Sequence, residues 1–413
     1  MTDTTTPTGD EMSAGDADAT HEEGVAPRSS ARPSDEMLPF LNNFHDIFTT
    51  IGILILLGGL GLGVGQLLGV IGFAAGTVAW QVCAITLIAA TAIVLWGLST
   101  ILVGSQRRIL PGIVLSLGFA GAAAAALIWL YVLVSIQLAG VDEEAFSTAF
   151  DAATGMEALR EQVDSVAANL PLQVRAFPIV IALAFLAPVL AYYRSFRLPF
   201  AGGLVGAGLV GLAISAYLVA KPYEFIVYSP LINVIAGLAL FVAGLVFDMR
   251  DPERATRLSG TGFWLHFFAA PTLLGAAVNA TYTGWTLDES DFELVAARDP
   301  VTAAATGDAS QAVEAAAVTL AVIAGFALVS LLINRRALIV AGLLTAGVSI
   351  GVLVSQVGLG VGAVVAITLL ALGGVVVLLG AAWNPVRRVL LAPFPDTGPL
   401  ARLFPPARAG AEG

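Results

Sequence analysis

Apolar runs long enough to cross a membrane alternate with short polar segments along most of the chain. A helix that crosses the hydrocarbon core of a bilayer needs about 20 mostly apolar residues. This requirement predicts ten spans, near 47–67, 81–104, 109–136, 176–193, 199–220, 229–247, 262–281, 315–333, 337–355 and 359–383. The pattern therefore predicts an all-α integral membrane protein, a polytopic bundle of about ten transmembrane helices.

The basic residues test the number of spans independently. Short cytoplasmic loops of membrane proteins carry an excess of Lys and Arg. If the amino terminus lies inside, every basic residue falls in a cytoplasmic segment except Arg160, Arg175, Lys221 and Arg298. We therefore expect ten spans with the amino and carboxyl termini both cytoplasmic.

The two ends of the chain differ from the apolar bundle between them. Residues 1–36 hold nine acids and two arginines, whereas a secretory signal begins with positive charge and a mitochondrial transit peptide is rich in arginine. We interpret 1–44 as a disordered acidic cytoplasmic tail, 45–389 as the helical bundle and 390–413 as a cytoplasmic C-terminal tail. A bacterial inner (plasma) membrane is the simplest location.

Two acidic loops are predicted on the outer side, near 139–175 and 282–314. In the first, apolar residues repeat every three or four positions from Phe146 to Leu170, which is typical of an amphipathic helix. We expect this helix to lie on the outer surface of the bundle, and the second loop to be partly irregular. A further alternative concerns residues 61–79, where repeated glycines would allow a kinked or re-entrant segment.

Composition excludes several classes of protein. Hydrophobic residues make up 57% of the chain and charged residues 12%, against about 25% charged in a soluble domain. The net charge of −11 and the near absence of lysine argue against nucleic acid as a partner. Because Cys83 is the single cysteine, the chain forms no internal disulfide and no cysteine-rich metal site. We expect no cofactor.

The sequence contains one glycine motif that resembles a nucleotide-binding fingerprint. Gly206, Gly208 and Gly211 spell GxGxxG, but a dinucleotide site needs a preceding strand and a later acid. Here the motif falls in the middle of a predicted span. We therefore expect these glycines to allow close packing between helices.

Polar residues inside the predicted spans are few and almost all neutral. Asn233, Asn279 and Gln356 would either hydrogen-bond between helices or line a path for a neutral solute. His266 lies among aromatic residues near the inner interface, where a structural role is expected and a proton relay or ligand role is the alternative. No acid pairs with His266 locally, and no span has a charge at its centre, which disfavours a proton-driven carrier.

One segment carries a resemblance to known sequences. Residues 251–254 read DPER, followed by FWLH at 263–266 and AAP at 269–271. This pattern resembles an uncharacterised family of bacterial polytopic inner-membrane proteins, for which no function is established. Its arginines, Arg250, Arg254 and Arg257, would hold the loop inside, or would bind an anionic head group or a partner's carboxylate.

We expect a non-enzymatic membrane component that serves as a binding, sensing or structural subunit. Its expected partners are membrane lipids and, as a further candidate, other membrane protein subunits. The alternative function is a permease for a small neutral or lipid-like solute. An intramembrane enzyme has the least support, because no acid is seen to pair with His266.

Overall fold

The computed structural model describes residues 44–139, 156–251, 256–283, 309–335, 337–355 and 360–395, with the single residues Thr286, Gly398, Leu400 and Phe404. Within those residues the regular structure is entirely helical. The helices are α1 (Phe44–Val70), α2 (Val78–Ser99), the π-helix η1 (Thr100–Ser105), α3 (Ile109–Ala139), α5 (Met156–Asn169), α6 (Leu172–Arg175), α7 (Phe177–Phe196), α8 (Pro199–Ala220), α9 (Pro222–Val227), α10 (Ser229–Arg250), α11 (Arg257–Thr283), α14 (Ala309–Ile333), α15 (Ala337–Ser355) and α16 (Val361–Leu391).

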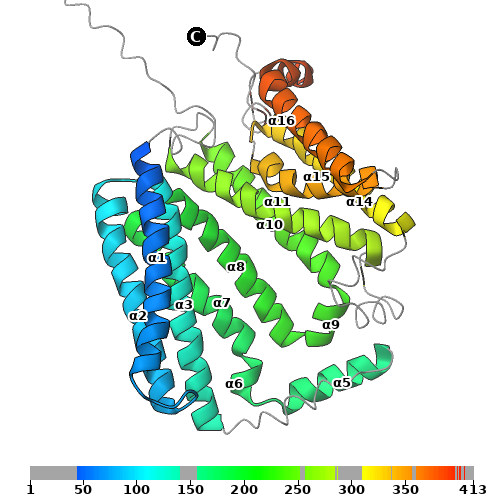
Figure 1. Cartoon of the computed structure of the whole chain (residues 1–413). Helices are drawn as coiled ribbons and strands as arrows, with labels where there is room; N and C mark the ends of the chain where they lie inside the picture. The colour runs from blue at the N-terminus through cyan, green and yellow to red at the C-terminus, as the bar shows by residue number, and fades with distance from the viewer. Residues whose placement is uncertain are drawn as a thin grey trace, which may run out of the picture.

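The long helices pack side by side, from α1–α3 at one side of the molecule to α14–α16 at the other (Figure 1). In the described part of the chain, seven helices are long and apolar enough to cross a membrane, or up to eight if the bent α16 is one span. The predictions of an all-α fold and of a multi-pass membrane protein are confirmed. Helices α11 and α15 occupy two more of the predicted spans and are not among those seven.

The first two helices form a hairpin. Helix α1 is continuous to Val70, and residues 71–77 turn the chain into α2. Gly72 and Gly76 have positive φ angles of 77° and 85°, a conformation that glycine adopts without steric cost. Thr77 caps α2, because its hydroxyl oxygen accepts a hydrogen bond from the Trp80 backbone N–H. The structure therefore shows a tight turn where a re-entrant segment was the alternative.

The amphipathic helix predicted in the first outer loop is confirmed for its second half. Helix α5 begins at Met156 and packs beside the short helix α9, at the lower right of Figure 1. The Arg160 guanidinium lies 5.5 Å from the centroid of the Tyr223 ring, a cation–π contact. Residues 140–155 and most of the second outer loop lie outside the described residues.

Among the described residues the core has three clusters, and α11 contributes to each; the third joins Ala270 of α11 to Ile333 of α14. In the first, aromatic rings from α2, α3 and α7 pack together, with Trp96 and Tyr192 6.0 Å apart and Tyr192 bonded to Ser99. In the second, α11 packs against α8 and α10 through Leu240, Leu265 and Ala269. Because α11 also contacts α14 and α15, it is the helix that joins the two sides of the bundle.

Glycines on α8 allow its close approach to its neighbours. A Cβ atom on Gly203 would lie 2.5 Å from the Trp264 Cβ, and one on Gly206 would lie 2.4 Å from a Leu265 methyl carbon. Gly208 meets Leu186 in the same way at 2.9 Å, whereas Gly211 has nothing within 4 Å. Packing, as predicted for this glycine motif, is confirmed for two of its three positions.

The Gly203→Ala variant is expected to lower stability. Its added methyl group meets a part of Trp264 held close to the α11 backbone, so α8 and α11 must move apart, at a cost of about 1–3 kcal/mol. The measurement is the midpoint of thermal unfolding in detergent. Gly211→Ala is the matched control on the same helix, and it is expected to leave the midpoint unchanged or raise it. Equal midpoints for the two variants would contradict the packing shown for α8.

Candidate functional site

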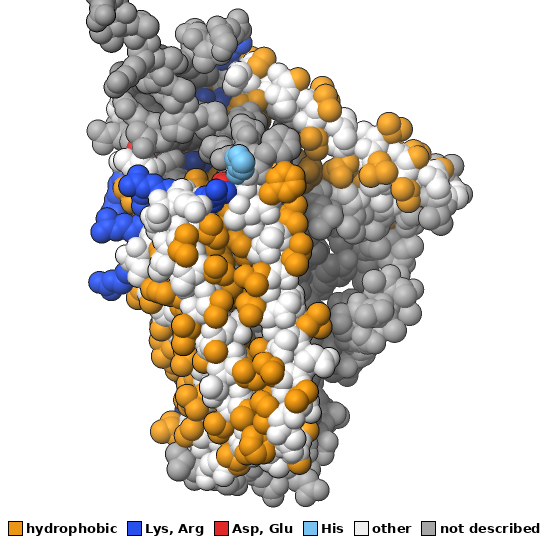
Figure 2. All heavy atoms as spheres, turned by 60° about the vertical axis from the view of Figure 1, so that its left-hand side comes forward, with side chains coloured by type: hydrophobic (Ala, Val, Ile, Leu, Met, Phe, Trp, Pro, Cys, Tyr) orange, Lys and Arg blue, Asp and Glu red, His pale blue; other side chains and the backbone are white. Residues whose placement is uncertain are grey.

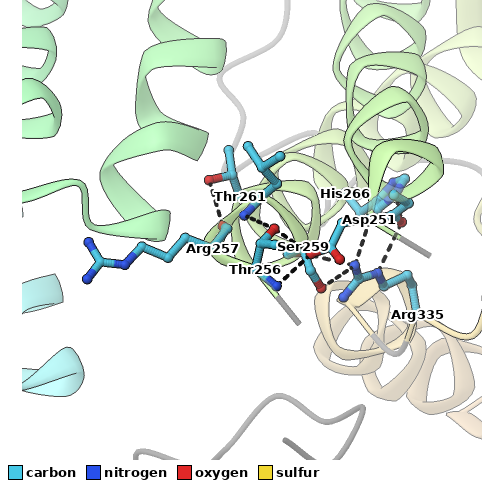
Figure 3. A network of polar contacts seen from close by, with 9 residues as sticks. Asp251, Thr256, Arg257, Ser259, Thr261, His266 and Arg335 are labelled. Atoms are coloured by element: carbon cyan, nitrogen blue, oxygen red, sulfur yellow. Dashed lines mark hydrogen bonds and ion pairs between the residues drawn. The ribbon is translucent and has the colours of Figure 1, made fainter. Parts of the chain in front are cut away.

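Four polar side chains from three separate parts of the chain meet inside the bundle. Asp248 lies near the end of α10, Ser259 and His266 lie on α11, and Arg335 follows the end of α14. We call these four residues the Asp248 cluster. In Figure 3, Arg335 points from the α14 side toward Ser259, on the helix that also carries His266. The fold thus gathers an acid, a base and a hydroxyl within a region of long apolar helices.

The Asp248 carboxylate is bound at both oxygens by Arg335. Arg335 Nη2 donates to Oδ1 at 2.6 Å and Arg335 Nε donates to Oδ2 at 3.0 Å, the two-pronged geometry that gives guanidinium pairs their strength. Nη2 also donates to the backbone oxygen and to the hydroxyl oxygen of Ser259, at 3.1 and 2.9 Å. The Arg335 residue is 4% exposed, so little water screens this ion pair.

His266 is the second donor to the same carboxylate. Its Nε2 lies 3.1 Å from Asp248 Oδ2. Because an ionised carboxylate can only accept, Nε2 carries the hydrogen. The ring is fully buried, and the opposite nitrogen, Nδ1, has no hydrogen-bond partner among the described residues. Among the described residues, one hydrogen-bonding position of the cluster therefore remains unused.

Small residues make room for the cluster. A Cβ atom on Gly244 would lie 2.8 Å from the His266 ring, and one on Gly262 would lie 2.5 Å from Asp248 Oδ1. Phe241 covers another side of the His266 ring, with its centroid 5.0 Å away. The contact between α10 and α11 thus depends on glycine at both positions.

The turn between α14 and α15 fixes the position of Arg335. Asn334 has a positive φ of 56°, which asparagine tolerates better than most residues. The Arg335 backbone N–H donates to the carbonyl of Ser330, and the Ser330 hydroxyl donates to the carbonyl of Arg335. This helix end resembles a Schellman motif and directs Arg335 toward α10.

Helix α16 holds the other side of that turn. Arg387 Nε donates to the carbonyl of Leu331 at 3.0 Å, and Trp383 Nε1 donates to Asn334 Oδ1 at 3.1 Å. The turn is therefore bonded to α16 as well as to the Asp248 cluster, and it connects the carboxyl-terminal helices to α10 and α11.

A second acid, Asp251, stabilises the start of α11. The Asp251 carboxylate accepts hydrogen bonds from the backbone N–H and the hydroxyl of Thr256, at 2.8 and 2.5 Å. The Thr256 hydroxyl oxygen in turn accepts from the Leu258 backbone N–H, as an N-cap residue does. These bonds set where α11 begins, and so where Ser259 and His266 face.

The residues singled out from the sequence lie in different places. His266 belongs to the cluster, whereas Arg250 and Arg257 are exposed at the ends of α10 and α11. Asn233 is exposed at the far end of α10, and its amide donates to the Ser229 carbonyl of its own helix. Arg254, Gln356 and the side chain of Asn279 lie outside the described residues.

The expectation that no acid pairs with His266 is wrong. Its partner, Asp248, stands 18 positions earlier in the chain, on the adjacent helix, so only the packing of α10 against α11 brings them together. One signal in the sequence could have found it. An acid within the last turns of an apolar run is costly to bury, so a buried cation is expected beside it.

A second charged contact joins α1 to α3. Arg108 Nη1 donates to Asp46 Oδ1 at 3.3 Å and to the Thr49 hydroxyl at 2.9 Å. Like the cluster, this contact lies where helices end. Among the described residues, no group of three His, Cys, Asp or Glu side chains is placed to hold a metal ion.

A charged pair lies exposed to solvent at the carboxyl-terminal end of α8, away from the Asp248 cluster. Lys221 Nζ is 3.0 Å from Glu224 Oε1. This hydrogen bond raises the pKa of Lys221 and lowers the pKa of Glu224. Exposed pairs of this kind contribute little to stability, so the pair differs in kind from the buried Asp248 cluster.

The chain matches no protein family model, no curated protein and no solved structure. Its function is therefore argued from its own geometry.

The Asp248→Asn variant is expected to destabilise the protein strongly. It leaves the buried Arg335 without a counter-charge, a loss of about 3–5 kcal/mol in comparable buried pairs. The measurement is the temperature at which half of the purified protein loses its monodisperse profile in size-exclusion chromatography. Arg250→Gln, which removes an exposed charge two residues along α10, is the control and should change stability by less than about 0.5 kcal/mol. A similar shift for both variants would show that the cluster does not hold the fold.

Proposed function

We propose that this protein is a non-enzymatic component of a bacterial inner membrane that serves as a binding, sensing or structural subunit. The observation that carries the proposal is the burial of the Asp248 cluster. Its members bond to one another, and His266 has no exposed surface. A side chain that catalyses a reaction must reach its substrate, and these are enclosed by α10, α11 and the α14–α15 turn.

The contacts of the Asp248 cluster are better suited to holding helices together than to catalysing a reaction. Asp248 accepts three hydrogen bonds from Arg335 and His266, so its carboxylate is already engaged. The segment that carries the family resemblance, 251–271, includes Ser259 and His266, and Asp248 stands three residues before it. We propose that the chain belongs to that bacterial family and that members of the family share this junction between α10 and α11.

The proposed topology has ten spans with both termini cytoplasmic. It counts α11, α15 and α16 as spans together with the seven helices of clear spanning character. The positions of the arginines support it, since the chain segments with most arginines lie at one end of the helices, the end that faces the cytoplasm under this proposal.

Helix α1 offers the surface on which another membrane subunit would bind. It is the least buried of the seven spans, with 11% of its apolar stretch buried. Gly61, Gly65 and Gly69 recur every four residues, and no atom of the described residues lies within 4 Å of a Cβ atom on any of them. Glycines at this spacing let a second helix approach closely in a membrane. This open face is why a subunit is proposed here.

Native mass spectrometry of the protein released mildly from its own membrane tests the proposal. We expect additional protein mass, because α1 has a packing face without a partner. Gly65→Leu should remove that mass, since the larger side chain blocks close approach. The matched control is Gly121→Leu on α3, another exposed glycine with nothing within 4 Å, which should retain it.

The alternative is a permease for a small neutral or lipid-like solute. The observation that favours it is the 55° bend of α16 between Gly362–Leu378 and Gly380–Leu391, since transporters often use broken helices around their substrate. A monomer that carries one stoichiometric small molecule, together with uptake in proteoliposomes that falls in an Asn233→Ala variant, would replace the subunit proposal by the permease.

A further inference from the structure

Exposed arginines gather at one end of the bundle. They are Arg107 before α3, Arg194 and Arg197 at the α7–α8 turn, Arg250 at the end of α10, Arg257 at the start of α11 and Arg388 near the end of α16. We call these six residues the arginine surface. Figure 2 shows Lys and Arg side chains at one end of the side that α1–α3 form, beyond the apolar surface.

Direct contacts place the segments of the arginine surface next to one another. A Cβ atom on Gly104, three residues before Arg107, would lie 3.8 Å from the Phe196 ring, next to Arg197. A Cβ atom on Gly260, near Arg257, would likewise lie 2.9 Å from Pro199. The α10–α11 region is joined in turn to the α14–α15 turn through the Asp248 cluster. The six arginines therefore share one end of the molecule.

Each of the three described acids near this end of the bundle has a hydrogen-bond partner. Asp46 is bonded to Arg108, Asp248 to Arg335 and Asp251 to Thr256. In the described part of the chain, none of the six arginines of the arginine surface forms an ion pair. Within the described residues, Asp46 and Asp248 are paired with other arginines, and Asp251 alone cannot balance the six positive charges of the arginine surface.

The segment that precedes α1 has the opposite charge. Residues 1–43 contain nine acids and two arginines. The segment joins the bundle at Phe44, and Asp46, two residues later, lies 3.3 Å from Arg108, the neighbour of Arg107. An acidic segment of 43 residues is thus attached directly beside the arginine surface.

We infer that residues 1–43 dock on the arginine surface and neutralise it. Two properties select this occupant over free acidic partners. Its charge is complementary to that of the six arginines. Because it is covalently attached, its effective concentration at the arginine surface is in the millimolar range. Its binding also avoids the loss of translational and rotational entropy that a separate partner would undergo.

The segment is long enough for this contact. A chain of 43 residues reaches at most about 140 Å when fully extended, at roughly 3.3 Å per residue. Neighbouring helices pack about 8–10 Å apart, so the arginines before α3, at the α7–α8 turn and at the start of α11 lie within reach. The acidic segment then competes with anionic lipids or acidic partners for the same arginines.

Distances between spin labels in the full-length protein test this inference. In a Cys83→Ala background, one label is placed at Ser13→Cys among the acids, and a second at the exposed Ser195→Cys between Arg194 and Arg197. The reference pair combines Ser13→Cys with Gln137→Cys, near the opposite end of α3. Pulsed electron paramagnetic resonance in nanodiscs of neutral phosphatidylcholine measures both pairs.

Docking predicts a defined short distance to position 195 and a longer one to position 137. Raising salt from about 0.1 M to about 1 M shortens the screening length from roughly 10 to 3 Å and should remove the short distance. Replacing the nine acids by their amides should remove the short distance as well.

The double variant Arg107→Gln with Arg257→Gln should lower the short-distance population about two- to fivefold. The matched control, Arg160→Gln with Arg175→Gln, removes the same number of charges at the other end and should leave it unchanged.

Two results would overturn the inference. A broad distribution to position 195 in neutral nanodiscs, insensitive to salt and to the amide substitutions, would show that the segment does not dock. A short distance in neutral nanodiscs that survives both about 1 M salt and the amide substitutions would show that charge complementarity does not hold the segment on the arginine surface.

Discussion

The carboxylate of Asp248 is the group on which the arrangement of the carboxyl-terminal half depends. It accepts two hydrogen bonds from Arg335 and one from His266, and it thereby joins α10, α11 and the turn after α14. An ion in so apolar a place is stable only when a counter-charge and hydrogen bonds replace the water it has lost. The three helices are held in one arrangement because separating them would leave a charge buried and unpaired.

The surrounding sequence is adapted to this interaction. Glycines at 244 and 262 leave the space that the His266 ring and the carboxylate occupy. The α14–α15 turn, with Asn334 in a left-handed conformation, aims Arg335 at α10, while α16 bonds the other side of the same turn. Stability in this part of the bundle therefore comes from a few directed polar contacts together with the close packing on α8. The unfilled Nδ1 of His266 is the one buried polar atom of the described residues that these contacts leave unsatisfied.

Much of the fold could be predicted from the sequence, because the need for about 20 apolar residues per span is a strong and local constraint. It located the long helices α1, α2, α3, α7, α8, α10, α11, α14, α15 and α16 but not the short helices α6 and α9. The three-and-four spacing of apolar residues predicted α5, and the glycine spacing on α8 predicted its packing role. The site could be predicted only in part. His266 stood out as a rare ionisable residue, but Asp248 and Arg335 were separated from it by 18 and 69 positions in the chain. The sequence indicates only that Arg335 belongs to a short basic segment between two spans, because its burial results from a turn conformation that no apolar pattern reveals.

A double-mutant cycle between Asp248 and Arg335 tests the central claim most directly. Unfolding free energies are compared for Asp248→Asn, Arg335→Gln and the double variant in one detergent. If the two side chains stabilise the bundle through each other, the double variant will be less destabilised than the sum of the single variants, with a coupling near the upper end of the roughly 0.5–3 kcal/mol range seen for contacting residues. Effects that add without coupling would contradict the account, because the helices would then be held together by contacts other than this ion pair.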